Sequence, residues 1–146
     1  NGNLILRYKF IPVECKYHSK NIRMSKSGNR KNKDTGDQGE QIALHYLHGC
    51  GYEILDTNWR YGKGELDIVA KTKNTLIIAE VKTRTSAKHG NPVETITKKQ
   101  QEILFKTATA YCEENSLSLG LRFDIIAILM EPETTLEHIE DAFRPY

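Results

Sequence analysis

Cysteine is scarce in this sequence and follows no recognisable binding pattern. The 146 residues contain only Cys15, Cys50 and Cys112, and no two of them have CxxC spacing. An odd number of cysteines without such spacing indicates neither a disulfide framework nor a zinc knuckle. The cysteine pattern therefore argues against a protein that is stabilised by disulfides or by structural zinc.

Long apolar runs are absent as well. No segment approaches the ~20 apolar residues that a membrane-spanning helix needs. The short run Leu4-Ile5-Leu6 is interrupted at once by Arg7 and Lys9, which leaves too little for a signal peptide. We therefore expect a soluble, cytoplasmic protein with no membrane partner.

Internal repeats and low-complexity tracts are also missing, and the length is that of one domain. Charge, however, is unevenly distributed. Residues 1–33 contain nine Lys or Arg against the single acid Glu14, whereas residues 34–146 contain twelve against eighteen Asp or Glu. We expect a basic, disordered extension at 1–33 and a single domain at 34–146. An ordered first strand between Leu4 and Val13 remains an open alternative.

The apolar pattern predicts an alternation of helices and strands. Asp37 and Glu40 have capping-box spacing and predict a helix that ends near Cys50. The other expected elements are strands at 52–59, 64–70 and 76–82, a loop at 84–94, a helix from the N-cap Thr97 to about 115, and strands at 122–130 and 136–143, the last at a sheet edge. The order α-β-β-β-α-β-β predicts an α/β fold with a mixed sheet flanked by helices.

The strands at 64–70 and 76–82 are separated by a break that suits a tight hairpin. Its central residues are Lys73 and Asn74, and Asn tolerates positive φ. Counting back from this turn places Asp67 opposite Glu80, and directly opposite residues have Cβ atoms ~4.5–5.5 Å apart. Both carboxylates are expected on one face of the sheet, because side chains alternate along a strand.

Two carboxylates held so close repel each other unless a proton or a divalent cation lies between them. The same register places Lys82 on their face, opposite Glu65. A hard cation such as Mg²⁺ with a lysine beside it is suited to phosphodiester hydrolysis. The hairpin therefore predicts a metal-dependent nuclease site.

A family resemblance points the same way. Asp67 followed by Glu80-Val81-Lys82 resembles the signature of the PD-(D/E)xK nuclease superfamily, in which a β-hairpin bearing the acids lies between two helices. Over roughly residues 36–129 the chain resembles the YraN-type family of small bacterial proteins, described as predicted endonucleases of this restriction-endonuclease-like superfamily. The shared motifs are, in order, Gly36-Asp37-Gln38-Gly39-Glu40 with Ala43, Tyr46-Leu47, Gly51-Tyr52, Asn58-Trp59-Arg60, Gly64-Glu65-Leu66-Asp67, Glu80-Val81-Lys82-Thr83-Arg84, Gly90-Asn91-Pro92-Val93-Glu94, Lys98-Lys99 and Arg122-Phe123-Asp124.

The resemblance implies a role for each residue of the signature. It makes Asp67 and Glu80 ligands of Mg²⁺ or Mn²⁺, with the carbonyl of Val81 as a third ligand. It implies that Lys82 orients or deprotonates the attacking water, or offsets charge on the transferring phosphate. Glu40 would approach from the first helix as an additional ligand or water-positioning acid.

Basic residues gather where a nucleic-acid backbone would need them, since only Glu94 interrupts the cations that follow Glu80. The expected nucleic-acid contacts are Arg60, Lys63, Arg84, Lys88, Lys98, Lys99 and Gln100, the last resembling a polar residue that relatives place near the lysine. No base-reading motif is visible, which favours recognition of structure over sequence. We expect DNA, rather than RNA, as the partner and leave the oligomeric state open, a homodimer included.

Each assignment has a structural alternative. The acids could form an ion network with Lys82 and Arg84, Lys82 could pair with Glu65, and Glu40 could be a capping-box acid. The remaining alternatives are a surface role for Gln100, His45 and His48, pairing of Asp124 with Arg122 or Arg60, and a core or rim position for Trp59. For the whole protein, the alternative is a catalytically silent nucleic-acid-binding or scaffold module with the same fold.

Overall fold

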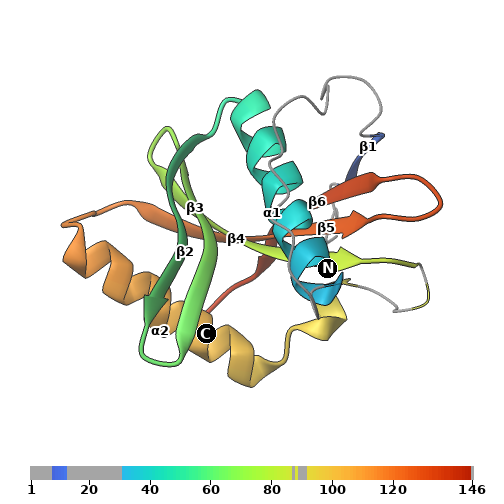
Figure 1. Cartoon of the computed structure of the whole chain (residues 1–146). Helices are drawn as coiled ribbons and strands as arrows, with labels where there is room; N and C mark the ends of the chain where they lie inside the picture. The colour runs from blue at the N-terminus through green and yellow to red at the C-terminus, as the bar shows by residue number, and fades with distance from the viewer. Residues whose placement is uncertain (1–7, 13–30, 87, 89–91, 146) are drawn as a thin grey trace, which may run out of the picture.

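The computed structural model describes residues 8–12, 31–86, 88 and 92–145. Its elements are β1 (Tyr8–Pro12), α1 (Lys31–Gly49), β2 (Glu53–Tyr61), β3 (Gly64–Thr72), β4 (Thr75–Arg84), the 3₁₀ helix η3 (Pro92–Thr95), α2 (Lys98–Glu114), β5 (Gly120–Leu129) and β6 (Thr135–Phe143). The strands form one mixed sheet in the order β1-β6-β5-β4-β3-β2, and β2 and β3 run steeply across the direction of β5 and β6 (Figure 1). The expected α/β order is therefore confirmed, with β1 added at one edge.

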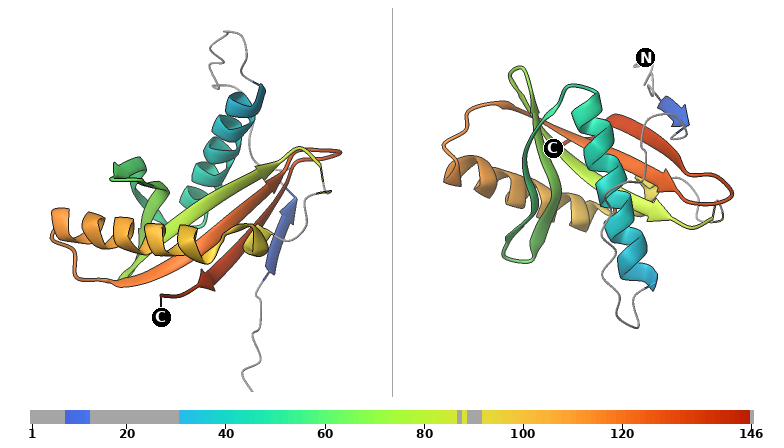
Figure 2. Two further views of the ribbon diagram at one scale, coloured as in Figure 1. Left: turned by 90° about the horizontal axis from the view of Figure 1, so that it is seen from below. Right: turned by 45° about the horizontal axis from the view of Figure 1, so that its top comes forward.

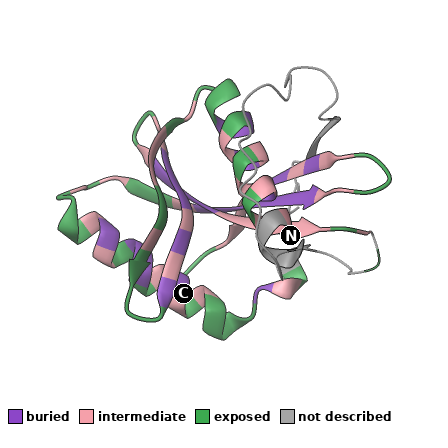
Figure 3. Ribbon diagram, in the orientation of Figure 1, coloured by how far each residue is buried: buried purple, intermediate pink, exposed green. Residues whose placement is uncertain are grey.

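Two helices cover the sheet from opposite sides (Figure 2). One core cluster joins Leu104, Ala108 and Tyr111 of α2 to the sheet, and the other joins Ala43 and Leu47 of α1 to it. Burial is greatest in β3, β4 and β5 (Figure 3). Strands covered on both faces read as nearly continuous apolar runs, which is why these three segments carry so few polar residues.

The hairpin between β3 and β4 has the expected register. Thr72 pairs with Thr75 and Ile68 with Ala79, which is the register from which Asp67 was counted opposite Glu80, although backbone pairing stops one residue before these two acids. The turn differs in one detail, because Lys73 rather than Asn74 takes the left-handed conformation, with φ 48°. Strand β4 then pairs in parallel with β5 along its whole length.

Three expectations about the ends of elements need correction. Helix α1 begins at Lys31, six residues before Asp37, so Asp37 and Glu40 are not its capping box. Strand β6 is not an edge strand, because β1 pairs with it from the far side. Residues Tyr8–Pro12 thus form the strand left open as an alternative to disorder; the other residues of the 1–30 segment lie outside the described part.

Helix α2 follows the sequence prediction closely. Thr97 is its N-cap, and the Thr97 hydroxyl accepts a hydrogen bond from the backbone N–H of Gln100 at 3.2 Å. The side chain of Gln100 in turn accepts from the N–H of Thr97 at 2.9 Å, which completes a capping box. No helix in the described ranges is both long and apolar enough to cross a bilayer.

Asp124 of β5 is the centre of a buried polar network that joins the layers. Its two carboxylate oxygens accept hydrogen bonds from Arg122 Nε and Nη2, both at 2.8 Å, from His138 Nε2 at 2.7 Å, and from the backbone N–H of Asp141 at 3.0 Å. His138 Nδ1 accepts from the hydroxyl of Tyr46 in α1 at 3.1 Å. The structural alternative for Asp124 is therefore the correct one, with Arg122 as its partner.

We predict that Asp124→Asn will lower the free energy of unfolding by ~3–5 kcal/mol, because it leaves Arg122 without its buried counter-charge. An amide also turns one acceptor of the network into a donor. Chemical denaturation of both proteins measures the difference. Glu133→Gln, at an exposed position between β5 and β6, is the matched control and should leave the midpoint in place. Equal midpoints for both variants would contradict the structural role.

Candidate active site

The candidate site lies where β3 separates from β4. Backbone pairing between these strands ends at Ile68 and Ala79. Beyond that point the Asp67 side chain replaces the ladder, since its Oδ2 accepts from the N–H of Val81 at 2.9 Å. Leu66 packs in the same core cluster as Val69, while Ile68 packs in the other. The alternation of β3 is therefore interrupted at Asp67, where the strand turns away.

Asp67 and Glu80 bring their carboxyl groups together in this fork, within reach of a shared hydrogen bond. Only 19% of the Glu80 side chain is exposed. Its Oε2 atom is buried and has no hydrogen-bond partner among the described residues, so a proton shared with Asp67 or a cation would satisfy it. The expected pairing of the two acids is thus present.

The electrostatics follow from burial. Burial in the fork, together with the negative charge of Asp67, raises the pKa of Glu80 to about 8. Burial also raises the pKa of Asp67, although the hydrogen bond from Val81 N–H opposes the shift. Two groups that each resist ionisation so strongly are typical of a site that binds a proton or a metal ion.

Lys82 lies beside the two acids, as the register predicted. Its Nζ atom is 3.7 Å from Glu80 Oε1, and 25% of its side chain is exposed. The alternative in which Lys82 pairs with Glu65 is wrong, because Glu65 forms an ion pair with Arg60 at 3.1 Å. Lys82 therefore lies beside Glu80 with a quarter of its side chain open to solvent.

Glu40 approaches the fork from α1. Its Oε2 accepts a hydrogen bond from Asn58 Nδ2 at 3.1 Å. Burial raises the pKa of Glu40, the bond from Asn58 lowers it, and the nearby negative charge of Asp67 raises it again. Glu40 thus lies within the electrostatic reach of Asp67 but is held by Asn58 and not by the two buried acids.

The donor set suits a hard divalent cation, although it is not closed. Among the described residues, no three His, Cys, Asp or Glu side chains are grouped so that they could hold a metal ion. Asp67 and Glu80 supply carboxylate oxygens, one of them without a partner. Val81 directs its N–H toward β3, and the carbonyl of the same residue lies on the same strand edge. These oxygens, with water, match the preference of Mg²⁺ for few protein ligands.

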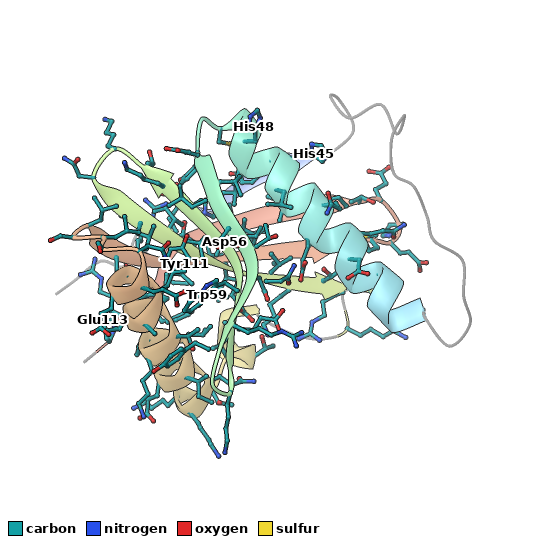
Figure 4. The ribbon with its side chains drawn as sticks, turned by 60° about the vertical axis from the view of Figure 1, so that its left-hand side comes forward. His45, His48, Asp56, Trp59, Tyr111 and Glu113 are labelled. Atoms are coloured by element: carbon teal, nitrogen blue, oxygen red, sulfur yellow. The ribbon has the colours of Figure 1, made fainter. Side chains whose placement is uncertain are left out.

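The expected basic contacts are spread over three elements. Lys63 and Arg60 are exposed on the β2–β3 hairpin, Arg84 ends β4, Lys88 follows it, and Lys98 and Lys99 open α2. The side chain of Gln100 is used in the capping box of α2, so the structural alternative describes it better. His45 and His48 lie on the exposed side of α1 (Figure 4).

Comparison with known proteins assigns the chain to a family. The model of "Uncharacterised protein family UPF0102" matches residues 39–128, more than half of the chain. The chain belongs to the UPF0102 family. The matched range contains all four acids and bases of the fork, and it ends before β6.

Several UPF0102 proteins are similar to this chain over most of its length. One from Christiangramia forsetii is 47% identical over 114 residues, which cover 77% of this chain and 96% of the relative. One from Phocaeicola vulgatus is 43% identical over 116 residues, covering 79% and 96%. One from Alkaliphilus oremlandii is 40% identical over 116 residues, covering 77% and 99%.

Two residues of the site were not assigned a role from the sequence. Asn58 holds Glu40 and has φ 51° within β2, a left-handed conformation that asparagine adopts more readily than most residues and that interrupts the strand. Gly39 lets α1 approach β4, because a Cβ atom there would overlap Thr83 Oγ1. A glycine inside a helical pattern was the one available signal for this contact.

We predict that the metal-free protein will lose stability as the pH rises from about 5 to above 8. The Glu80 carboxyl has a pKa of about 8 in the native protein, above its ordinary value of 4.5. Between these values the native state binds more protons than the unfolded state, so the free energy of unfolding falls with increasing pH. Denaturation midpoints in EDTA measure this slope.

Glu80→Gln should flatten that profile and should raise stability at pH 8 by ~1–3 kcal/mol, the cost of an unsatisfied buried polar group. Its amide can donate to Asp67 where the carboxylate could not. Glu113→Gln, exposed on α2, is the control and should keep the slope of the wild type. If stability depended on pH in the same way for the wild type and for Glu80→Gln, the buried pair would not be the origin of the pH dependence.

We also predict opposite effects of alanine at two glycines of α1. Gly36→Ala should stabilise the protein by ~0.5–1 kcal/mol, because nothing lies within 4 Å of the added atom and Ala favours a helix. Gly39→Ala should destabilise it by ~1–3 kcal/mol through overpacking against Thr83. Thr83→Ala should recover part of that loss in a double-mutant cycle. Stabilisation by Gly39→Ala would show that α1 is not held against β4 by this contact.

Proposed function

We propose that this UPF0102 protein is a Mg²⁺- or Mn²⁺-dependent nuclease that hydrolyses phosphodiester bonds in DNA. The observation that carries the proposal is the buried pair Asp67 and Glu80, of which one carboxylate oxygen has no partner in the described part of the chain. A purely structural pair would be expected to satisfy its oxygens, as Asp124 does on the neighbouring strand β5. The resemblance to the PD-(D/E)xK superfamily supports the same function.

A divalent cation would be held by Asp67, Glu80 and the carbonyl of Val81, with Glu40 as a further acid at the mouth of the fork. When bound, it supplies Lewis-acid stabilisation of the charge that develops on a phosphoryl group. A cation there would also favour the ionised form of both acids, which burial opposes.

Lys82 is suited to act on the water or on the phosphate. Its ammonium group is next to Glu80 and a quarter of its side chain is exposed, so it can meet a substrate at the mouth of the fork. There it can orient the attacking water or offset negative charge in the transition state. Glu40, held by Asn58, is placed to hydrogen-bond the same water.

A nucleic acid is proposed as the substrate because of the exposed basic residues, and DNA is preferred over RNA because of the resemblance to restriction-endonuclease-like proteins. Lys63, Lys88, Lys98 and Lys99 are all exposed, and basic groups of this kind bind phosphates without reading sequence. Preference would then depend on the shape of the nucleic acid. A panel of labelled duplex, single-strand, flap and four-way-junction substrates with Mg²⁺ and Mn²⁺ tests both the reaction and the preference.

We predict that two substitutions will separate metal binding from catalysis. Asp67→Asn removes a ligand charge, so calorimetric titration should show loss of Mn²⁺ binding while the fold is kept. Lys82→Ala leaves both carboxylates in place, so Mn²⁺ should still bind while cleavage falls by ~10²–10⁴-fold.

Lys106→Ala, exposed on α2, is the matched control and should cleave like the wild type. A catalytically silent binding module predicts a different result, in which the wild type binds nucleic acid without binding Mn²⁺ or cleaving any substrate. If Lys82→Ala unfolds the protein and the wild type does not respond to Mn²⁺, the acids form a structural ion network and the nuclease proposal fails.

A further inference from the structure

The tip of the β2–β3 hairpin presents an aromatic ring to solvent. Tyr61, the last residue of β2, is 56% exposed and is one of only two large apolar side chains that are exposed in the described part of the chain. Its ring is parallel to that of Trp59, with 3° between the planes and 6.2 Å between the centroids. Tyr61 therefore continues an aromatic stack that begins in the core.

Trp59 makes the base of this stack rigid. It packs against the core cluster of α2 and meets Tyr111 edge to face, with centroids 5.1 Å apart and 88° between the planes (Figure 4). Gly64, which pairs with Tyr61, lies so close to α2 that a Cβ atom would overlap Thr107 Oγ1. The hairpin tip is thus fixed to α2, and a flat ligand would meet a preorganised surface.

Positive charge flanks the exposed ring. Lys63 is exposed in the turn two residues after Tyr61, whereas Arg60, 77% exposed, lies on the other face of the hairpin and is paired with Glu65. An aromatic face combined with cations is the pattern that single-stranded nucleic acid requires, because bases stack on the ring while phosphates meet the cations. A second copy of this chain fits less well, since a two-fold contact at the ring would bring Lys63 close to the same charge on the partner.

The platform is within reach of the fork. Gly64, opposite Tyr61, is three residues before Asp67 on β3, a distance of ~10 Å along the strand. The rings face α2, whereas Arg60 and Glu65 alternate to the other face. A strand that stacks on Tyr61 would therefore cross the hairpin tip, past Lys63 and Arg60, to reach the acids.

We infer that Tyr61, supported by Trp59, is a stacking platform for an unpaired base of single-stranded DNA. Duplex DNA offers no free base face in its interior, so the platform would favour substrates with an unpaired segment, such as flaps and single-stranded ends. The inference rests on the proposed function for the reaction that follows, but base binding at Tyr61 can be measured without cleavage.

The test compares binding of a fluorescein-labelled short oligothymidylate and of a blunt duplex by anisotropy in EDTA. Tyr61→Ala should weaken binding of the oligothymidylate by ~5- to 100-fold, the loss expected for one base–aromatic stack. Tyr61→Phe keeps the ring and should bind like the wild type, and binding of the duplex should not change. Leu121→Ala removes the other exposed large apolar side chain, on β5, and is the matched control.

Trp59 gives an independent signal, because it is the only tryptophan of the chain. Its emission should be quenched when the oligothymidylate binds to the wild type and less so in Tyr61→Ala. Unchanged oligothymidylate binding by Tyr61→Ala, an equal loss for duplex, or equal weakening by Tyr61→Phe would overturn the platform. A wild-type dimer in light scattering that becomes a monomer with Tyr61→Ala would instead assign the ring to contact between copies.

The two proposals fail in different ways. If the oligothymidylate binds through Tyr61 but Mn²⁺ produces no cleavage of any substrate, the platform stands and the nuclease proposal fails. If the wild type cleaves DNA and Tyr61→Ala changes neither binding nor cleavage of single-stranded substrates, the nuclease proposal stands and the platform fails.

Discussion

The structure depends on the burial of two carboxyl groups where β3 leaves β4. The Asp67 carboxylate accepts a hydrogen bond from the Val81 N–H, a donor that backbone pairing would otherwise use. The two strands therefore separate next to Glu80, the second acid of the pair. Burying charge without partners is costly, and Glu80 Oε2 has none. Neighbouring features maintain the fork, since Gly39 allows α1 to approach β4 and Gly64 allows β3 to approach α2.

A comparison with Asp124 shows that burial of an acid does not by itself leave the acid without hydrogen-bond donors. Asp124 pairs with Ala79, the residue before Glu80, and it is completely buried. Burial alone would raise its pKa, but hydrogen bonds from His138 and Arg122 outweigh burial and lower it. Glu80 is less completely buried, with 19% of its side chain exposed, yet it has a like charge beside it and a raised pKa. One buried acid is saturated with donors, and the other lacks them, which is what separates a structural group from a candidate functional one.

The features that depend on residues close together in the sequence were predicted correctly. The two-residue turn at Lys73 fixed the register of Asp67 and Glu80, and Thr97 with apolar residues at helical spacing fixed α2. Prediction failed for features that depend on contacts between distant segments of the chain. Helix α1 continues through Gly36 to Lys31, although glycine and the polar residues around it favour an end there. Strand β6 is internal because β1, more than a hundred residues away, pairs with it. The fourfold pairing of Asp124 likewise requires groups from β6, which no local pattern around β5 could supply.

The same limit applies to the β2–β3 hairpin, whose position decides what the site can bind. Asn58 has a left-handed conformation inside β2 and lies between residues paired with Leu66 and Ile68, so it faces Asp67. Both strands are thus irregular at one level, and the hairpin beyond it is free to turn toward α2. That turn has two consequences. It opens the fork beside Asp67, and it carries Tyr61 out to solvent on a base of Trp59 and Tyr111. The opening beside the two acids and the exposure of the Tyr61 ring therefore have the same origin, the irregularity of β2 and β3 at Asn58 and Asp67. It connects the proposed reaction in the fork with the proposed base binding at the hairpin tip.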